Sequence, residues 1–137
     1  MTPQPAGSQI KILIVDDNDK MRAFVHEALQ SLPVMILESE NGIEAMNLIE
    51  QEKPALLITD YQMPAWDGLE VCRQIRKQPG LKHIKILMVT GHVVDRELLQ
   101  AVNFRLVDAA LSKPVNLTEL KQLTKHLLGL DASPPTP

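Results

Sequence analysis

Short apolar runs recur along the chain and alternate with longer segments in which the apolar residues are spaced three or four apart. The runs at residues 10–15, 55–58 and 84–89 are nearly continuous and rich in β-branched residues, which is typical of parallel strands covered on both faces. Two shorter runs lie at residues 34–37 and 109–111, and the last has little β preference because it contains only alanine and leucine. The pattern predicts five strands.

The intervening segments have apolar stripes at helical spacing, which predict one helix after each strand. Pro33, Pro54 and Pro79 close the first three of these segments. The fourth segment, residues 95–104, has a less regular stripe. The last begins at Asn116, which with Glu119 resembles a capping box, and Gly129 suits its C-cap. The clear stripes comprise Met21, Val25, Ala28 and Leu32; Ile43, Met46 and Ile49; Leu69, Cys72 and Ile75; and Leu120, Leu123 and Leu127.

Alternation of strand and helix five times predicts a doubly wound α/β domain with a mostly parallel sheet. Right-handed crossovers then place all the carboxyl ends of the strands at one edge, where ligands bind in such sheets. Polar residues follow four of the predicted strands: Asp16 and Asp17 after the first, Asp60 after the third, Thr90 after the fourth and Lys113 after the fifth. These side chains are therefore expected to lie close together.

Three carboxylates at one edge repel one another unless a cation joins them. Oxygen ligands with open positions suit Mg²⁺, which keeps several waters and commonly bridges protein acids and phosphoryl oxygens. Lys113 would add a positive charge and Thr90 a hydroxyl donor for the same phosphoryl group. The chemistry that this set indicates is phosphoryl transfer onto a carboxylate, catalysed mainly by positioning and charge neutralisation.

Each of these residues also has a simpler interpretation when it is taken alone. Asp16 and Asp17 could cap the following helix, and Asp60 could form the turn before Pro64. Thr90 could be an ordinary hydroxyl at a strand end, and Lys113 a solvated lysine. These interpretations do not explain why all the residues fall at corresponding ends of four separate strands.

The length of 137 residues suits one folded domain, which the pattern places at residues 10–129. The flanking segments, residues 1–9 and 130–137, are rich in proline and small or polar residues, so both are predicted to be disordered. The second of these is compatible with a natural end or with a linker to a further domain.

The formal net charge of −3, without a long basic stretch, argues against a nucleic-acid-binding or membrane-surface protein. The single cysteine, Cys72, excludes an internal disulfide and lies on an apolar stripe, as expected of a core thiol. No secretory signal or membrane-spanning apolar stretch is present in the sequence, so a cytoplasmic location is expected.

Four motifs together give the chain a specific likeness to a known family. They are LIVDDN at residues 13–18, ITDYQMPAWDG at 58–68, ILMVTG at 86–91 and LSKPV at 111–115. In this order and at these spacings, the sequence resembles the receiver domain of two-component response regulators, including the chemotaxis regulators, over nearly the whole predicted domain. The resemblance implies a flavodoxin-like (βα)5 fold with a parallel five-stranded sheet in the order 2-1-3-4-5.

The resemblance also implies a role for each site residue. Asp60 is the expected phosphoacceptor, and Asp16 and Asp17 are expected to hold Mg²⁺ together with Asp60 and the backbone carbonyl of Gln62. Thr90 corresponds to the switch hydroxyl, and Lys113 to the lysine that pairs with the phosphoryl group. The peptide bond between Lys113 and Pro114 is expected to be cis, which is uncommon even for proline.

The sequence departs from the family pattern just before Lys113. Receivers usually carry Tyr or Phe three residues before this lysine, whereas this chain has Ala110, and the turn at residues 105–108 lacks the common glycine. Gln62 and His92 occupy positions that flank the path of the attacking water in the family, so they are candidates for tuning dephosphorylation. Both could equally be simple polar surface residues.

The leading hypothesis is a signalling switch and not an enzyme with a separate substrate. Phosphorylation of Asp60 by a histidine kinase, a phosphotransfer protein or a small phosphodonor would change the face formed by the fourth helix, fifth strand and fifth helix, which a downstream protein would bind. Ala110 favours an alternative, a constitutive interaction module that acts without phosphorylation. A third hypothesis, a flavodoxin-like enzyme or flavin carrier, is disfavoured because the acidic segment at residues 16–19 would repel a phosphate after the first strand unless a metal intervened.

Overall fold

A computed structural model describes residues 9–91, 100 and 106–130. Five parallel strands form one sheet in the order β2-β1-β3-β4-β5, as the resemblance implied. The strands are β1 (Lys11–Val15), β2 (Met35–Ser39), β3 (Leu56–Asp60), β4 (Lys85–Thr90) and β5 (Ala109–Ser112). The predicted fourth helix lies outside the described residues except for Gln100, as do nearly all residues of the two predicted terminal segments.

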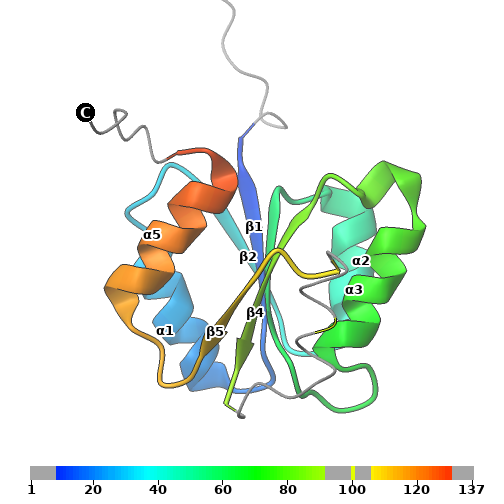
Figure 1. Cartoon of the computed structure of the whole chain (residues 1–137), viewed down its shortest axis with the longest axis horizontal. Helices are drawn as coiled ribbons and strands as arrows, with labels where there is room; N and C mark the ends of the chain where they lie inside the picture. The colour runs from blue at the N-terminus through cyan, green and yellow to red at the C-terminus, as the bar shows by residue number, and fades with distance from the viewer. Residues whose placement is uncertain (1–8, 92–99, 101–105, 131–137) are drawn as a thin grey trace, which may run out of the picture.

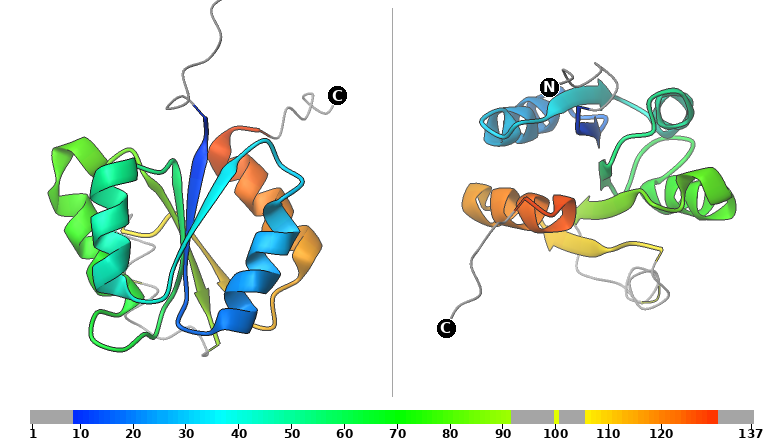
Figure 2. Two further views of the ribbon diagram at one scale, coloured as in Figure 1. Left: turned by 180° about the vertical axis from the view of Figure 1, so that it is seen from behind. Right: turned by 90° about the horizontal axis from the view of Figure 1, so that it is seen from above.

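Helices cover both faces of the sheet (Figures 1 and 2). Among the described residues, α1 (Asp19–Leu29) and α5 (Leu117–Leu128) pack on one face, and α2 (Gly42–Glu52) and α3 (Gly68–Lys77) pack on the other. Helix α3 is followed by the short 3-10 helix η2 (Pro79–Leu81). The strands run toward the lower end of the molecule in Figure 1, where α1 begins. None of the helices in the described residues is long and apolar enough to cross a membrane.

The central strands form the core. Every residue of β3 is buried, and the apolar residues of β1 and β4 are at most 3% exposed. Alternate side chains contribute to two apolar clusters, one beneath α1 and α5 and the other beneath α2 and α3. The predicted stripe of α3, Leu69, Cys72 and Ile75, is fully buried, and burial raises the pKa of the Cys72 thiol to about 12. The sequence thus identified the central strands and this helix face correctly.

Two predicted details were wrong. Helix α1 ends at Leu29, and Leu32 closes the turn that follows by donating its backbone N–H to the Leu29 carbonyl, 3.0 Å away. Leu32 is therefore outside the helix, although it still packs against the same apolar cluster as Val25. Pro33 restricts only the residue before it, Leu32, to non-helical conformations, so it excludes Leu32 from the helix but does not itself set the end at Leu29. Ile43 is 52% exposed because the inward-facing positions of α2 are Gly42, Ala45, Met46 and Ile49.

The turn before β5 is held by side chains instead of the common glycine. The Asp108 carboxylate accepts the backbone N–H of Ile86 at 2.7 Å and pairs with Arg76 at 3.0 Å. Arg76 also donates to the backbone carbonyls of Lys82, Ile84 and Leu106. These contacts join α3, β4 and β5 at the end of the sheet opposite the carboxyl ends of the strands.

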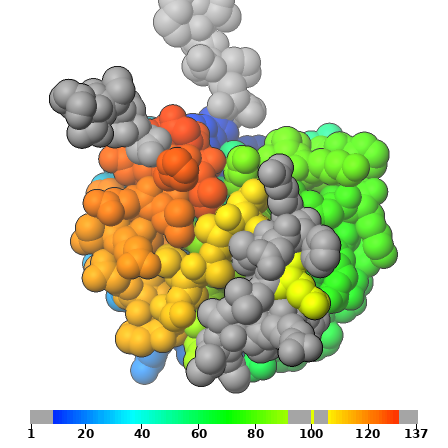
Figure 3. Space-filling model, in the orientation of Figure 1, coloured from blue at the N-terminus to red at the C-terminus, as the bar shows by residue number. Residues whose placement is uncertain are grey.

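Helix α5 and strand β5 lie side by side at the surface (Figure 3). Asn116 caps α5 by accepting the backbone N–H of Glu119 at 2.9 Å, and Gly129 ends the helix in the left-handed conformation with φ 71°. Both predicted caps are therefore confirmed. The opposite edge strand, β2, continues through Glu38 and Ser39 beyond its apolar run, because an edge strand tolerates polar residues.

The close approach of α3 to β3 generates a prediction about stability. A Cβ atom on Gly68 would lie 2.3 Å from the backbone oxygen of Asp60, whereas one on Gly80 would meet nothing within 4 Å. Overpacking of this kind costs roughly 1–3 kcal/mol. We expect Gly68→Ala to lower the free energy of unfolding by about that amount in urea denaturation, and Gly80→Ala to leave it equal or slightly higher. Equal losses in the two variants would contradict this account.

Candidate functional site

Strand β3 positions Asp60 at the carboxyl edge of the sheet. Leu56, Leu57 and Ile58 are at most 2% exposed, so the strand cannot shift without disturbing both apolar clusters. Beyond the strand, the backbone N–H of Tyr61 donates to the Val89 carbonyl at 3.1 Å. Asp60 itself is only 8% exposed. The strand therefore holds one carboxylate in a fixed, largely buried position.

Asp16 and Asp17 follow the neighbouring strand, β1. Asp16 is 4% exposed, and its carboxylate accepts the backbone N–H of Asn18 at 2.9 Å, while Asp17 is exposed. The helix cap is Asn18, whose side chain accepts the backbone N–H of Met21 at 3.0 Å. The suggestion that the two aspartates cap this helix is therefore wrong, and both remain available for another role.

The fold brings three carboxylates and one amine together. Carboxylate oxygens of Asp16, Asp17 and Asp60 lie within 4.8 Å of one another. Lys113 reaches them from the loop after β5, with its Nζ 3.4 Å from Asp16 Oδ2 and 3.6 Å from Asp60 Oδ1. Residues that are far apart in the sequence thus converge as the strand-end pattern predicted.

Thr90 ends β4 beside Lys113. It is 1% exposed, and its backbone carbonyl accepts the N–H of Lys113 at 2.7 Å. In the sheet it lies opposite Ser112 of β5. The next peptide bond, between Lys113 and Pro114, is cis. These contacts link the end of β4 directly to the segment that carries the lysine.

Burial and neighbouring charge both act on Asp60. Burial raises the pKa of its carboxyl above the ordinary value, and the charges of Asp16 and Asp17 add to this increase. The charge of Lys113 and a backbone hydrogen bond from Tyr61 act in the opposite direction but do not cancel it. Three oxygen-bearing acids with one lysine among them are therefore short of positive charge, and this donor set fits a hard divalent cation such as Mg²⁺.

The other three positions singled out in the sequence are Gln62, His92 and Ala110. Gln62 is exposed in the loop after Asp60, and His92 lies outside the described residues. Ala110 is half-buried on β5, opposite Met88, and packs against the cluster beneath α2 and α3. An alanine therefore occupies the position where the resemblance led us to expect an aromatic ring.

Two residues that contribute to the site were missed in the sequence. Gly68 allows α3 to approach the Asp60 backbone, and its N–H donates to the Tyr61 carbonyl at 2.8 Å. The side chain of Arg22 donates from Nη1 to the backbone oxygen of Asp16 at 2.6 Å. The glycine at the start of an amphipathic helix was a usable signal, but nothing in the pattern around Arg22 distinguished it from a solvated arginine.

Comparisons with known proteins agree with this geometry. The profile of the response regulator receiver domain matches residues 12–125. A chemotaxis protein CheY homolog from Campylobacter jejuni is 33% identical over 122 residues, which cover 88% of this chain and 93% of that protein. The solved structure of the chemotaxis protein CheY4 from Vibrio cholerae has a TM-score of 0.79 and 27% identity, covering 88% of this chain and all of that one.

The same fold also occurs as a part of much larger proteins. A histidine kinase P4 from Formosa agariphila is 33% identical over 120 residues, which cover 85% of this chain but only 8% of that protein. The family profile matches most of this chain, whether the related domain stands alone or forms part of a longer protein. The chain therefore belongs to the response regulator receiver domain family, whose members act in phosphorylation-based two-component signalling.

Proposed function

We propose that Asp60 is the phosphoacceptor of this receiver. The observation that carries the proposal is the position of its carboxylate, which is buried at the end of β3, 3.6 Å from Lys113 and beside Asp16 and Asp17. A rigid carboxylate next to a cation can act as a nucleophile toward phosphorus, because catalysis of phosphoryl transfer depends mainly on positioning and charge neutralisation.

In the proposed reaction an oxygen of Asp60 forms a bond to phosphorus while the bond from phosphorus to the donor breaks. The electron pair of that bond leaves with the donor group, a histidine nitrogen of a kinase or phosphotransfer protein, or the acetate oxygen of acetyl phosphate. Lys113 neutralises charge on the phosphoryl oxygens, and the Thr90 hydroxyl donates a hydrogen bond to one of them. The product is an acyl phosphate on Asp60.

Asp16, Asp17 and Asp60, with the backbone carbonyl of Gln62, would hold Mg²⁺. When bound, the ion supplies positive charge that draws the acids together and attracts the phosphoryl group. Gln62, which is exposed beside Asp60, and His92 are proposed to set how long the acyl phosphate survives. Their proposed role rests on sequence position.

The output surface is proposed to be the face that includes β5 and α5. Both lie at the surface (Figure 3). Lys113 lies in the segment between them, because β5 ends at Ser112 and α5 begins at Leu117. Ala110 has no ring that could move with the Thr90 hydroxyl. The hydrogen bond from Lys113 N–H to the Thr90 carbonyl, 2.7 Å long, offers a backbone route from the site to this face.

Phosphorylation can be measured directly as a change in intact mass. We expect the protein incubated with Mg²⁺ and acetyl phosphate to gain one phosphoryl group, and Asp60→Asn to gain none, because the amide is a poor nucleophile. Addition of EDTA should strongly slow the gain in the parent protein. If the folded, Mg²⁺-bound parent gains no mass, the alternative of a constitutive interaction module, which Ala110 favours, takes precedence.

The charge imbalance at Asp60 predicts a pH-dependent stability. Because the pKa of this carboxyl is raised in the folded protein, ionisation opposes folding, and stability decreases as the pH rises through the pKa of the unfolded state and then that of the folded state. Without Mg²⁺ at about pH 7, well above the ordinary carboxyl pKa, Asp60→Asn is therefore expected to have a higher urea midpoint than the parent.

The difference should shrink as the pH is lowered toward about 4, where the unfolded carboxyl becomes protonated. Glu27→Gln, which removes an exposed acid from α1, is the control and should change the midpoint little at any pH. A lower midpoint for Asp60→Asn at pH 7 would show that attraction to Lys113 outweighs burial and repulsion from the two other acids.

A further inference from the structure

Arg22 lies between the acidic site and the edge of the sheet. It is in the first turns of α1, and its side chain is only 13% exposed. Its guanidinium donates from Nη1 to the backbone oxygen of Asp16 at 2.6 Å. The arginine therefore contacts the main chain at the point where β1 delivers its two acids.

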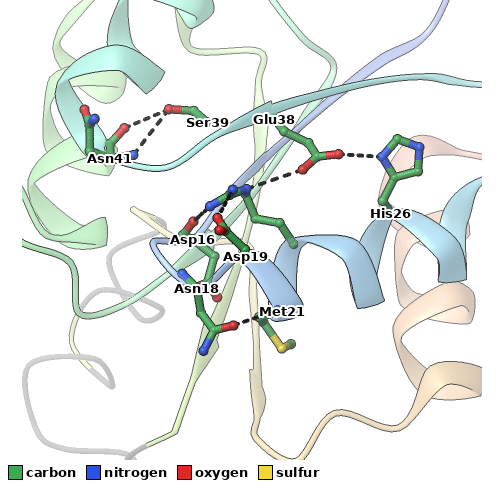
Figure 4. A network of polar contacts seen from close by, with 9 residues as sticks. Asp16, Asn18, Asp19, Met21, His26, Glu38, Ser39 and Asn41 are labelled. Carbon is green, nitrogen blue, oxygen red and sulfur yellow. Dashed lines mark hydrogen bonds and ion pairs between the residues drawn. The ribbon is translucent and has the colours of Figure 1, made fainter.

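The other nitrogens of the guanidinium are held by two acids. Nη2 pairs with Asp19, and Nε lies 3.4 Å from Glu38 Oε1. The second oxygen of Glu38 lies 2.7 Å from His26 Nδ1, so Glu38 is held between the two basic side chains (Figure 4). A planar guanidinium can join several acceptors in fixed directions, which a lysine ammonium cannot do.

These contacts, with two others, fix Asp16 along its backbone and its side chain. Its N–H donates to the Ser39 carbonyl of β2 at 3.2 Å, its carbonyl accepts from Arg22, and its carboxylate accepts from Asn18. The arginine thereby ties the loop after β1 to α1 and, through Glu38, to β2. Without it, the Asp16 carbonyl would lose its charged donor in a largely buried environment.

We propose that Arg22 is a positioning residue for the Mg²⁺ site: it holds the backbone that presents Asp16 and Asp17 and does not contact the ion. The inference rests on the proposed function, because it concerns the same cation. Residues that orient the ligands of a metal without binding it typically change affinity by 10–100-fold when they are replaced.

A positioning role and a simple charge effect have opposite signs. If Arg22 only added positive charge near the acids, its removal would strengthen Mg²⁺ binding, because like charges repel. If it holds the acids in place, its removal weakens binding. The direction of the change in Mg²⁺ affinity therefore separates the two effects.

The experiment is isothermal titration of the whole protein with Mg²⁺ alone, for the parent, Arg22→Gln and Arg22→Lys. We expect the Kd to rise about tenfold in Arg22→Gln. In Arg22→Lys, which keeps the charge but not the planar fork, a rise smaller than that of Arg22→Gln is expected. Lys20→Gln is the matched control, since it removes one positive charge from an exposed position on the same helix. Its Kd should stay equal to that of the parent or fall.

The phosphorylation rate with acetyl phosphate gives a second measurement. Arg22→Gln should phosphorylate slowly at limiting Mg²⁺ and recover most of the parent rate when Mg²⁺ is saturating, which general destabilisation would not produce. An unchanged or lower Kd in Arg22→Gln overturns the inference while leaving the proposed function intact. If Arg22→Gln does not fold, an unchanged Kd in Arg22→Lys has the same meaning. A parent protein that neither binds Mg²⁺ nor gains a phosphoryl group overturns both.

Discussion

Three carboxylates that repel one another are held together at the carboxyl edge of the sheet, and the fold has to keep them there. Oxygens of Asp16, Asp17 and Asp60 lie within 4.8 Å of one another, and Lys113 is near two of these acids. Burial of Asp60 strengthens the effect, because a charge in a poorly solvated position interacts more strongly with its neighbours. The arrangement is costly for an isolated protein, but it attracts a cation and an anionic group bound to that cation.

Such a site needs a scaffold that does not relax to separate the charges. Asp16 and Asp17 follow β1, and Asp60 is the last residue of β3. These two strands are adjacent in the centre of the sheet, and their apolar residues are buried against helices on both faces. Gly68 lets α3 pack directly against the backbone of Asp60, so this end of β3 has little space in which to move away from the other acids. The stability supplied by ordinary apolar packing therefore sustains an electrostatic arrangement that would not form alone.

Much of this organisation could be predicted from the sequence, because the apolar runs show where each central strand ends. Continuous apolar runs give the central strands, and parallel pairing then brings Asp16, Asp60 and Lys113 to one edge whatever the details of packing. The strand order came from the likeness to known receivers, since the apolar pattern fixes no neighbours. The wrong prediction for Ile43 and the missed role of Arg22 both concern tertiary contacts, which the apolar pattern does not specify. The exposure of Ile43 follows from which side of α2 meets the sheet, and the role of Arg22 from a side chain that reaches back to β1.

Ala110 changes how such a site can communicate with the rest of the molecule. A ring at this position could move between buried and exposed places when the Thr90 hydroxyl shifts, whereas a methyl group, half-buried opposite Met88, has no comparable second position. The backbone of β4 and β5 remains continuous with the site, through the 2.7 Å hydrogen bond between Thr90 and Lys113. Lys113 also faces Asp60, so a charge gained there acts on the residue that leads from β5 toward α5. A signal carried this way would shift strand and helix backbone together, and would require a partner that senses the position of α5 and not the orientation of one ring.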